Sequence, residues 1–176
     1  MIMSRIPNKH GGGASTHANG LRFEQTTSLN DALIKRGYNV TSDGRVYYND
    51  KLIGYSKAKH QFKNYLKSIG VNLKVNSDTL LPDDTFINLA NKTVYIIEKK
   101  FQHGSGSVDE KLQTCLYKRR QYEKLVSQIE YDVVYTYILS DWFKQNKYID
   151  VLEYIKDVGC YYFFNELPLD FLNIEG

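Results

Sequence analysis

Two carboxylates and an amine lie in the chain where they could act together on a phosphate. Asp83 is followed fifteen residues later by Glu98, and Lys100 comes two residues after Glu98. The carboxylates are hard oxygen ligands of the kind that Mg²⁺ prefers. Such a cation acts as a Lewis acid and lowers the pKa of a bound water, while an amine can orient or deprotonate that water or stabilise a pentavalent phosphate. These residue types are those that metal-dependent phosphodiester cleavage requires.

A β-hairpin is expected to position these groups. The apolar runs Thr85–Leu89 and Thr93–Ile97 are separated by the turn-like segment Ala90-Asn91-Lys92, which is a hairpin pattern. Side chains alternate between the two faces of a strand, so Lys100 is expected to share a face with Glu98.

The register of this hairpin decides which aspartate faces Glu98. For a turn centred on Ala90-Asn91, opposite residues have numbers that sum to about 181, which places Asp83 across from Glu98. A three-residue turn would change the sum to about 182 and would bring Asp84 there instead. The register alone therefore leaves Asp83 and Asp84 both possible as the metal ligand beside Glu98, with Asp84 as the alternative ligand if the turn has three residues.

The elements around the hairpin alternate between helical and strand patterns. Helices and strands in alternation favour an α/β fold, with a mixed central β-sheet that is parallel in part and flanked by α-helices. The expected elements are a helix over about Asn19–Arg36 with Gly37 as its C-cap, a meander over Tyr38–Tyr55, a helix over Lys57–Ser68 closed by Gly70, a weak strand over Val71–Val75, a helix from Ser107 to about Ser127 with Ser107 and Glu110 as a capping box, a strand over Tyr131–Leu139, a helix over Asp141–Asp157 with a break near Asn146, and a strand over Cys160–Phe164.

Composition limits the class of protein. With 176 residues and 42% apolar content, the chain is expected to form a single domain over residues 1–176, with a flexible, glycine-rich segment at residues 1–18. The net charge of +3 implies that any basic surface is local. Cys115 and Cys160 have neither metal-like nor secreted-type spacing, and no run has the length of a membrane span. We therefore expect a cytoplasmic protein with free thiols and no membrane partner.

The motif resembles that of the PD-(D/E)XK nuclease superfamily, and within it the type II restriction endonucleases. The resemblance rests on Pro82-Asp83 and Glu98-Lys99-Lys100, on the apolar run Val94–Ile97 before the acid, on the segment from Asn19 to Glu24, and on Gly106–Lys111. It covers roughly residues 18 to 125 and is most specific in its middle third.

The resemblance implies a restriction-endonuclease-like core and Mg²⁺-dependent cleavage of double-stranded DNA at a short specific sequence. Asp83 and Glu98 would bind the metal, Lys100 would be catalytic, and Glu24 would lie near the metal as a supporting acid. A palindromic target would favour a homodimer. A cognate DNA methyltransferase would be a genetic partner and not a physical one.

Other readings of the same residues remain open. A structure-selective or repair nuclease would have the same site, and a catalytically inactive DNA-binding protein would have the same fold. Lys59, Lys63 and Lys67 share one helix side that could follow a phosphate backbone, although a solvated lysine face is the commoner reason for such a pattern. Gln113 and Tyr117 resemble a motif of recombination nucleases, but a pair on a helix surface is the simpler interpretation.

Overall fold

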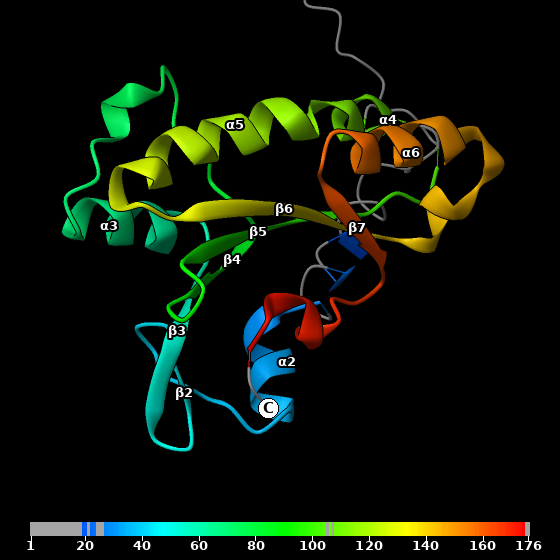
Figure 1. Cartoon of the computed structure of the whole chain (residues 1–176). Coiled ribbons are helices and arrows are strands. Elements are labelled where there is room, and N and C mark those ends of the chain that lie inside the picture. The colour runs from blue at the N-terminus through cyan, green and yellow to red at the C-terminus, as the bar shows by residue number, and fades with distance from the viewer. Residues whose placement is uncertain (1–18, 21, 24–26, 105, 107, 175–176) are drawn as a thin grey trace, which may run out of the picture.

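The computed structural model describes residues 19–20, 22–23, 27–104, 106 and 108–174, and it has an α/β fold built on a mixed open sheet. Seven strands lie side by side in the order in which they occur in the chain (Figure 1). The strands from β1 to β5 pair antiparallel, whereas β5, β6 and β7 are parallel. The strands are β1 Asn39–Val40, β2 Arg45–Tyr48, β3 Lys51–Lys57, β4 Asp84–Asn88, β5 Thr93–Lys100, β6 Asp132–Leu139 and β7 Tyr161–Phe164.

The expected hairpin is confirmed as β4 and β5, and its register is the one predicted for a turn centred on Ala90-Asn91. Asp84 pairs with Ile97 and Thr85 with Ile96, so paired numbers sum to 181. The Asn88 side chain closes the turn, because its Oδ1 atom accepts hydrogen bonds from the backbone N–H groups of Ala90 and Asn91 at 2.9 and 3.3 Å. The strand β5 continues three residues beyond its predicted end, to Lys100.

Helices cover both faces of the sheet. The helices α3 (His60–Ser68) and α5 (Cys115–Val126) lie across one face, and α2 (Leu29–Lys35) lies on the other with the C-terminal 3₁₀ helix Leu169–Leu172 (Figure 1). The helices α4 (Val108–Lys111) and α6 (Ile149–Asp157) lie near the β7 edge.

The two faces of β5 enter two separate hydrophobic cores. Val94 and Ile96 pack in the core beneath α3 and α5, whereas Tyr95 and Ile97 pack in the core around α2. Because side chains alternate along a strand, this division assigns Glu98 to the α5 face. Central strands that are apolar on both faces are typical of a sheet with helices on both sides.

The prediction of a single helix over Asn19–Arg36 is wrong, because helical backbone stops before α2 and a new helix begins there. Helical backbone occurs at residues 19–20 and 22–23, and α2 begins only at Leu29. The Ser28 hydroxyl accepts the Asp31 backbone N–H at 3.4 Å, so Ser28 caps a new helix. The predicted C-cap at Gly37 is supported by its φ of 96°, which favours glycine.

Three further boundaries differ from expectation. The weak strand predicted over Val71–Val75 is wrong, because the segment forms a 3₁₀ helix over Leu73–Val75 in which the Asn72 side chain accepts the Lys74 N–H at 3.0 Å. The helix predicted from Lys57 begins at His60, since Lys57 still pairs with Thr85 in the sheet. The segment expected as one helix from Ser107 contains 3₁₀ turns at Leu112–Thr114 and Ser127–Ile129. The break predicted near Asn146 is present, because Gln145 is extended, and the residues before α6 form the 3₁₀ helices Asp141–Lys144 and Asn146–Tyr148.

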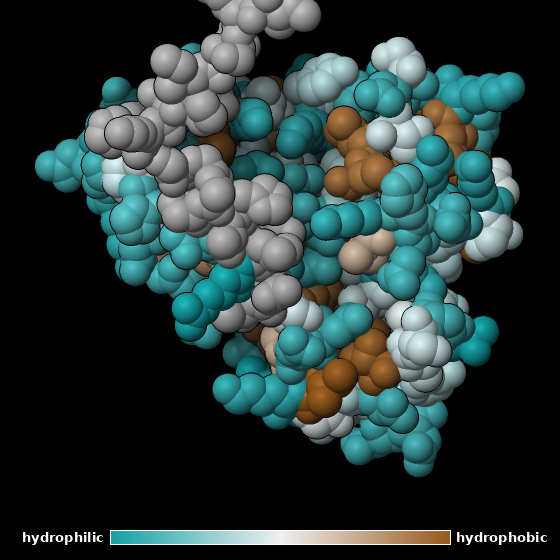
Figure 2. Space-filling model, turned by 180° about the vertical axis from the view of Figure 1, so that it is seen from behind, coloured by the Kyte–Doolittle hydropathy of each residue, from teal (hydrophilic) through white to brown (hydrophobic). Residues whose placement is uncertain are grey.

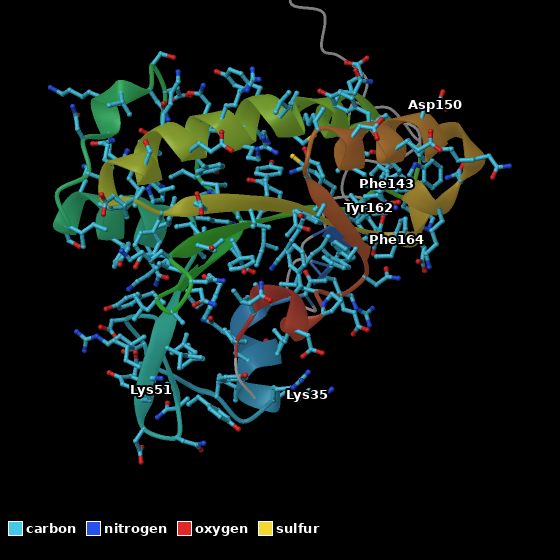
Figure 3. All side chains as sticks on the ribbon, in the orientation of Figure 1. Lys35, Lys51, Phe143, Asp150, Tyr162 and Phe164 are labelled. Carbon is cyan, nitrogen blue, oxygen red and sulfur yellow. The ribbon has the colours of Figure 1, made fainter. Side chains whose placement is uncertain are left out.

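The face shown in Figure 2 is largely hydrophilic where its residues are coloured, and its apolar side chains form separate patches and not one continuous area. Phe143, Tyr162 and Phe164 gather around β7, and Lys35 and Lys51 lie at the end of the molecule away from Asp150 (Figure 3). Among the described helices, none is long and apolar enough to cross a lipid bilayer. The segment at residues 1–18 and the capping residue Ser107 lie outside the described residues.

Candidate functional site

Glu98 and Lys100 meet at the end of β5 that follows the buried part of the strand. The Lys100 Nζ atom lies 3.1 Å from Glu98 Oε2, and the two side chains are 16% and 8% exposed. The strand places them on one face, because they are two residues apart. The predicted juxtaposition of these two residues is therefore present in the structure. Charged groups this far from solvent require partners, and each supplies one for the other.

Asp83 is held beside them by the backbone of β5. Its Oδ2 atom accepts the Lys99 backbone N–H at 2.8 Å. This hydrogen bond lies one step beyond the last ladder pair of β4 and β5, which joins Asp84 to Ile97. The register therefore brings Asp83 next to Glu98 at the open end of the hairpin, where each carboxylate can act on the same bound group.

Asp84 points away from this site. Its carboxylate lies 2.7 Å from the Lys99 Nζ atom and accepts the Leu29 backbone N–H at 3.4 Å, which places it on the α2 face. Burial raises the pKa of Asp84, and the nearby Lys99 ammonium opposes that rise. The register and this ion pair make Asp84 a structural residue that joins the sheet to α2, so the alternative in which Asp84 faces Glu98 does not fit the structure.

A second ammonium group, from α5, enters the same site. The Lys118 Nζ atom lies 3.8 Å from Glu98 Oε2, the oxygen that Lys100 also contacts. Burial lowers the pKa of Lys118, while the neighbouring carboxylates of Glu98 and Asp83 raise it and the Lys100 ammonium lowers it. Lys118 is therefore under the influence of both carboxylates and of two other ammonium groups, those of Lys100 and Lys111.

The sequence interpretation missed Lys118, although a signal for it was present. Cys115, Tyr122 and Leu125 are buried on α5, and Lys118 is three residues after the first and four before the second. Residues at these spacings share a helix face. A lysine on the buried face of an amphipathic helix needs a charged partner, and here that partner is Glu98.

The donor set suits a hard divalent cation. Among the described residues, no hydrogen bond reaches Asp83 Oδ1 or Glu98 Oε1, so each carboxylate has an oxygen for a metal. Mg²⁺ commonly binds through one or two carboxylates together with water and phosphate oxygens. Within the part of the chain that the structure describes, no three or more His, Cys, Asp or Glu side chains form a metal-binding group. Two carboxylates are enough for Mg²⁺ only where phosphate and water oxygens supply its remaining ligands.

A buried hydroxyl lies beneath the site. Tyr122 is fully buried, and its hydroxyl has no hydrogen-bonding partner in the described structure. Burial raises the pKa of Tyr122, and the charges of Glu98 and Asp83 raise it further. The phenol therefore stays neutral within range of the two carboxylate charges.

The other candidates from the sequence lie elsewhere. Glu24 is outside the described residues, so its expected place near the metal stays a prediction. Gln113 and Tyr117 are exposed, as expected for a pair on a helix surface. His103 is also exposed. Trp142 is half-buried against the core and donates through Nε1 to the Tyr148 hydroxyl at 2.7 Å, which supports its assignment to packing.

The basic side of α3 begins next to the site. The Lys59 backbone N–H donates to the Pro82 carbonyl oxygen at 2.8 Å, directly before Asp83. Lys59 and Lys67 are exposed and Lys63 is half-buried.

Comparisons of the chain with protein-family models, with curated proteins and with solved structures gave no match.

Proposed function

We propose that this protein is a Mg²⁺-dependent deoxyribonuclease with a restriction-endonuclease-like core, and that it acts as a type II restriction endonuclease. One observation carries the proposal: Glu98 and Lys100 are in contact at the end of a hairpin whose register brings Asp83 beside Glu98. The position of these groups beside a mixed sheet covered by helices is consistent with the PD-(D/E)XK resemblance.

The proposed reaction is hydrolysis of a phosphodiester bond in double-stranded DNA. Asp83 and Glu98 would hold Mg²⁺ through their free oxygens. When bound there, the cation supplies Lewis acidity and lowers the pKa of a water in its coordination shell. Lys100 would orient the attacking water or stabilise the charge that develops on the phosphate. The half-buried surroundings of these groups strengthen such electrostatic effects, because the local dielectric constant is lower than that of water.

Glu24 and the quaternary structure belong to the proposal as well. Glu24 is proposed as a supporting acid near the metal. A two-fold homodimer would place one site on each strand of a palindromic target, as symmetry requires. A methyltransferase that protects the host DNA is the expected genetic partner.

Digestion of unmethylated plasmid and phage DNA tests this function. Wild-type protein is incubated with Mg²⁺ or with EDTA, next to Asp83→Ala and Lys100→Ala variants of equal purity. Discrete fragments that need Mg²⁺ and vanish in both variants would support a restriction endonuclease. A smear that shows the same dependence would favour the structure-selective or repair nuclease. Absence of cleavage on every DNA would favour a DNA-binding protein without catalysis.

A further inference from the structure

Lys118 occupies a partly buried position, where an ammonium group is destabilising unless it has an anionic partner or ligand. It lies on the buried side of α5 between Cys115 and Tyr122, which are both fully buried. Its side chain is 25% exposed. A charged amine in such a place loses part of its hydration, and this loss must be offset by a charged partner or by a ligand.

The carboxylate that Lys118 contacts is already paired. Glu98 Oε2 is contacted by Lys100 at 3.1 Å and by Lys118 at 3.8 Å. One ammonium is sufficient to neutralise one carboxylate, so the longer contact leaves Lys118 weakly bound and able to turn to another anion. The site therefore holds more positive charge than Glu98 alone needs.

We propose that Lys118 is a second catalytic cation, which contacts a non-bridging oxygen of the scissile phosphate and stabilises the pentavalent transition state. This inference rests on the proposed nuclease function. The charges support it: two carboxylates balance one Mg²⁺, and Lys100 and Lys118 then contribute two positive charges. A phosphodiester has one negative charge, and its pentavalent transition state approaches two when water has lost a proton. Two ammonium groups match the transition state better than the ground state, which is the requirement for rate acceleration.

The chemical step leaves Lys118 protonated throughout. The water oxygen donates an electron pair to phosphorus and loses one proton to solvent. One phosphorus–oxygen ester bond breaks with its electron pair on the leaving oxygen, which then takes up a proton. Lys118 contributes only its positive charge and its N–H groups, so an arginine at this position should replace part of its effect.

The test compares Lys118→Met, Lys118→Arg and Lys124→Met. Methionine retains most of the aliphatic volume without the charge. Lys124 is exposed on the same helix, so its variant controls for the loss of one positive charge from α5. Phage DNA is cleaved under single-turnover conditions with saturating protein and Mg²⁺. DNA affinity is measured with Ca²⁺ in place of Mg²⁺, and stability is measured by urea unfolding.

Loss of one donor to a developing charge typically lowers the rate about 10²–10³-fold. We expect this loss for Lys118→Met, a partial recovery for Lys118→Arg, and a rate within about twofold of wild type for Lys124→Met. DNA affinity should change far less than the rate in every variant, because the gain is realised in the transition state.

The outcomes separate this inference from the proposed function. An active wild type with Lys118→Met cleaving at the same rate would overturn the role of Lys118 and leave the nuclease intact. A rate loss matched by equal losses of DNA affinity and stability would show a structural or binding role and would also overturn it. A wild type without cleavage in Mg²⁺ would overturn both proposals.

Discussion

The charge cluster makes a prediction about stability that does not depend on any activity. In Glu98→Gln, the carboxylate that lies between the Lys100 and Lys118 ammonium groups becomes neutral. Those groups approach the same oxygen at 3.1 and 3.8 Å and are 16% and 25% exposed. Without the negative charge they repel each other in a partly buried site.

Coulomb's law gives the size of the effect. The two ammonium nitrogens are at most 6.9 Å apart, because they lie 3.1 and 3.8 Å from one oxygen, and unit charges at that separation repel by roughly 2 kcal/mol at an effective dielectric constant of about 20. Part of the repulsion is relieved by side-chain movement, and the variant no longer has a charged carboxylate to desolvate. We therefore expect Glu98→Gln to lower the free energy of unfolding by about 2 kcal/mol at neutral pH, which is below the roughly 3–5 kcal/mol reported for breaking fully buried pairs.

Urea unfolding of four proteins measures this repulsion directly. The set is wild type, Glu98→Gln, Lys118→Met and the double variant. Removing Lys118 from the Glu98→Gln protein should restore stability, with a coupling of about 2 kcal/mol in the double-mutant cycle. The loss should shrink as salt is added, because exposed parts of the cluster are screened.

The pH dependence has a defined sign. In Glu98→Gln the Lys118 pKa falls further below its unfolded value, because the carboxylate that raised it is gone. The unfolded state then binds more protons than the native state at alkaline pH, so stability rises with pH relative to wild type. Equal stability of Glu98→Gln and wild type at low salt, with no coupling to Lys118, would refute the shared-carboxylate geometry.

Three other variants test the assignments on the hairpin and the sheet. Asp83→Asn should lower single-turnover cleavage at least about 100-fold, whereas Asp84→Asn should keep the wild-type rate; the reverse result would make Asp84 the ligand. Burial raises the Asp84 pKa in the fold, so the stability that Asp84 contributes is present below its ordinary pKa near 3.8 and is lost as pH rises through the raised value. In urea titrations between about pH 3 and 7, Asp84→Asn should therefore flatten the dependence of the free energy of unfolding on pH. An unchanged pH dependence would contradict the burial of Asp84. Gly54→Ala should cost about 2–3 kcal/mol, because its Cβ would lie 2.3 Å from a backbone oxygen of β4, while Gly104→Ala meets nothing within 4 Å and should be neutral in the same assay.

The sequence was most informative where one local signal determined the structure. A turn centred on Ala90-Asn91 predicts the observed register sum of 181, whereas the choice of Asp83 over Asp84 also depends on the proline-aspartate spacing of the nuclease family that the motif resembles. The parallel pairing of β5, β6 and β7 followed from the alternation of strands and helices. Both features depend on short-range patterns that a single chain displays.

The sequence was less informative where tertiary contacts or local caps compete with periodicity. The apolar pattern continues through Ser28, and only its side-chain hydrogen bond shows that a new helix begins there. The run Val71–Val75 looks extended, but the Asn72 backbone N–H donates to the Gln128 side chain at 2.9 Å, 56 residues away. Such a contact is not visible in a local pattern.

Lys118 is a third case, because its place on the buried face of α5 is visible in the helix pattern whereas its charged partner is not. Its partner Glu98 is 20 residues earlier in the chain, and only the packing of α5 on the sheet brings the two together. Charged residues on apolar helix faces are therefore worth pairing with motif acids before a structure is known.

Sequencing of fragment ends is the most direct test of the central claim. Unmethylated phage DNA is digested with wild type in Mg²⁺, with wild type in EDTA and with Asp83→Ala in Mg²⁺, and the ends are mapped at single-base resolution. We expect the first reaction alone to give new ends, all within or beside one short common sequence. Ends that are absent, or that occur equally in the EDTA and Asp83→Ala reactions, would contradict a metal-dependent nuclease site at Asp83, Glu98 and Lys100.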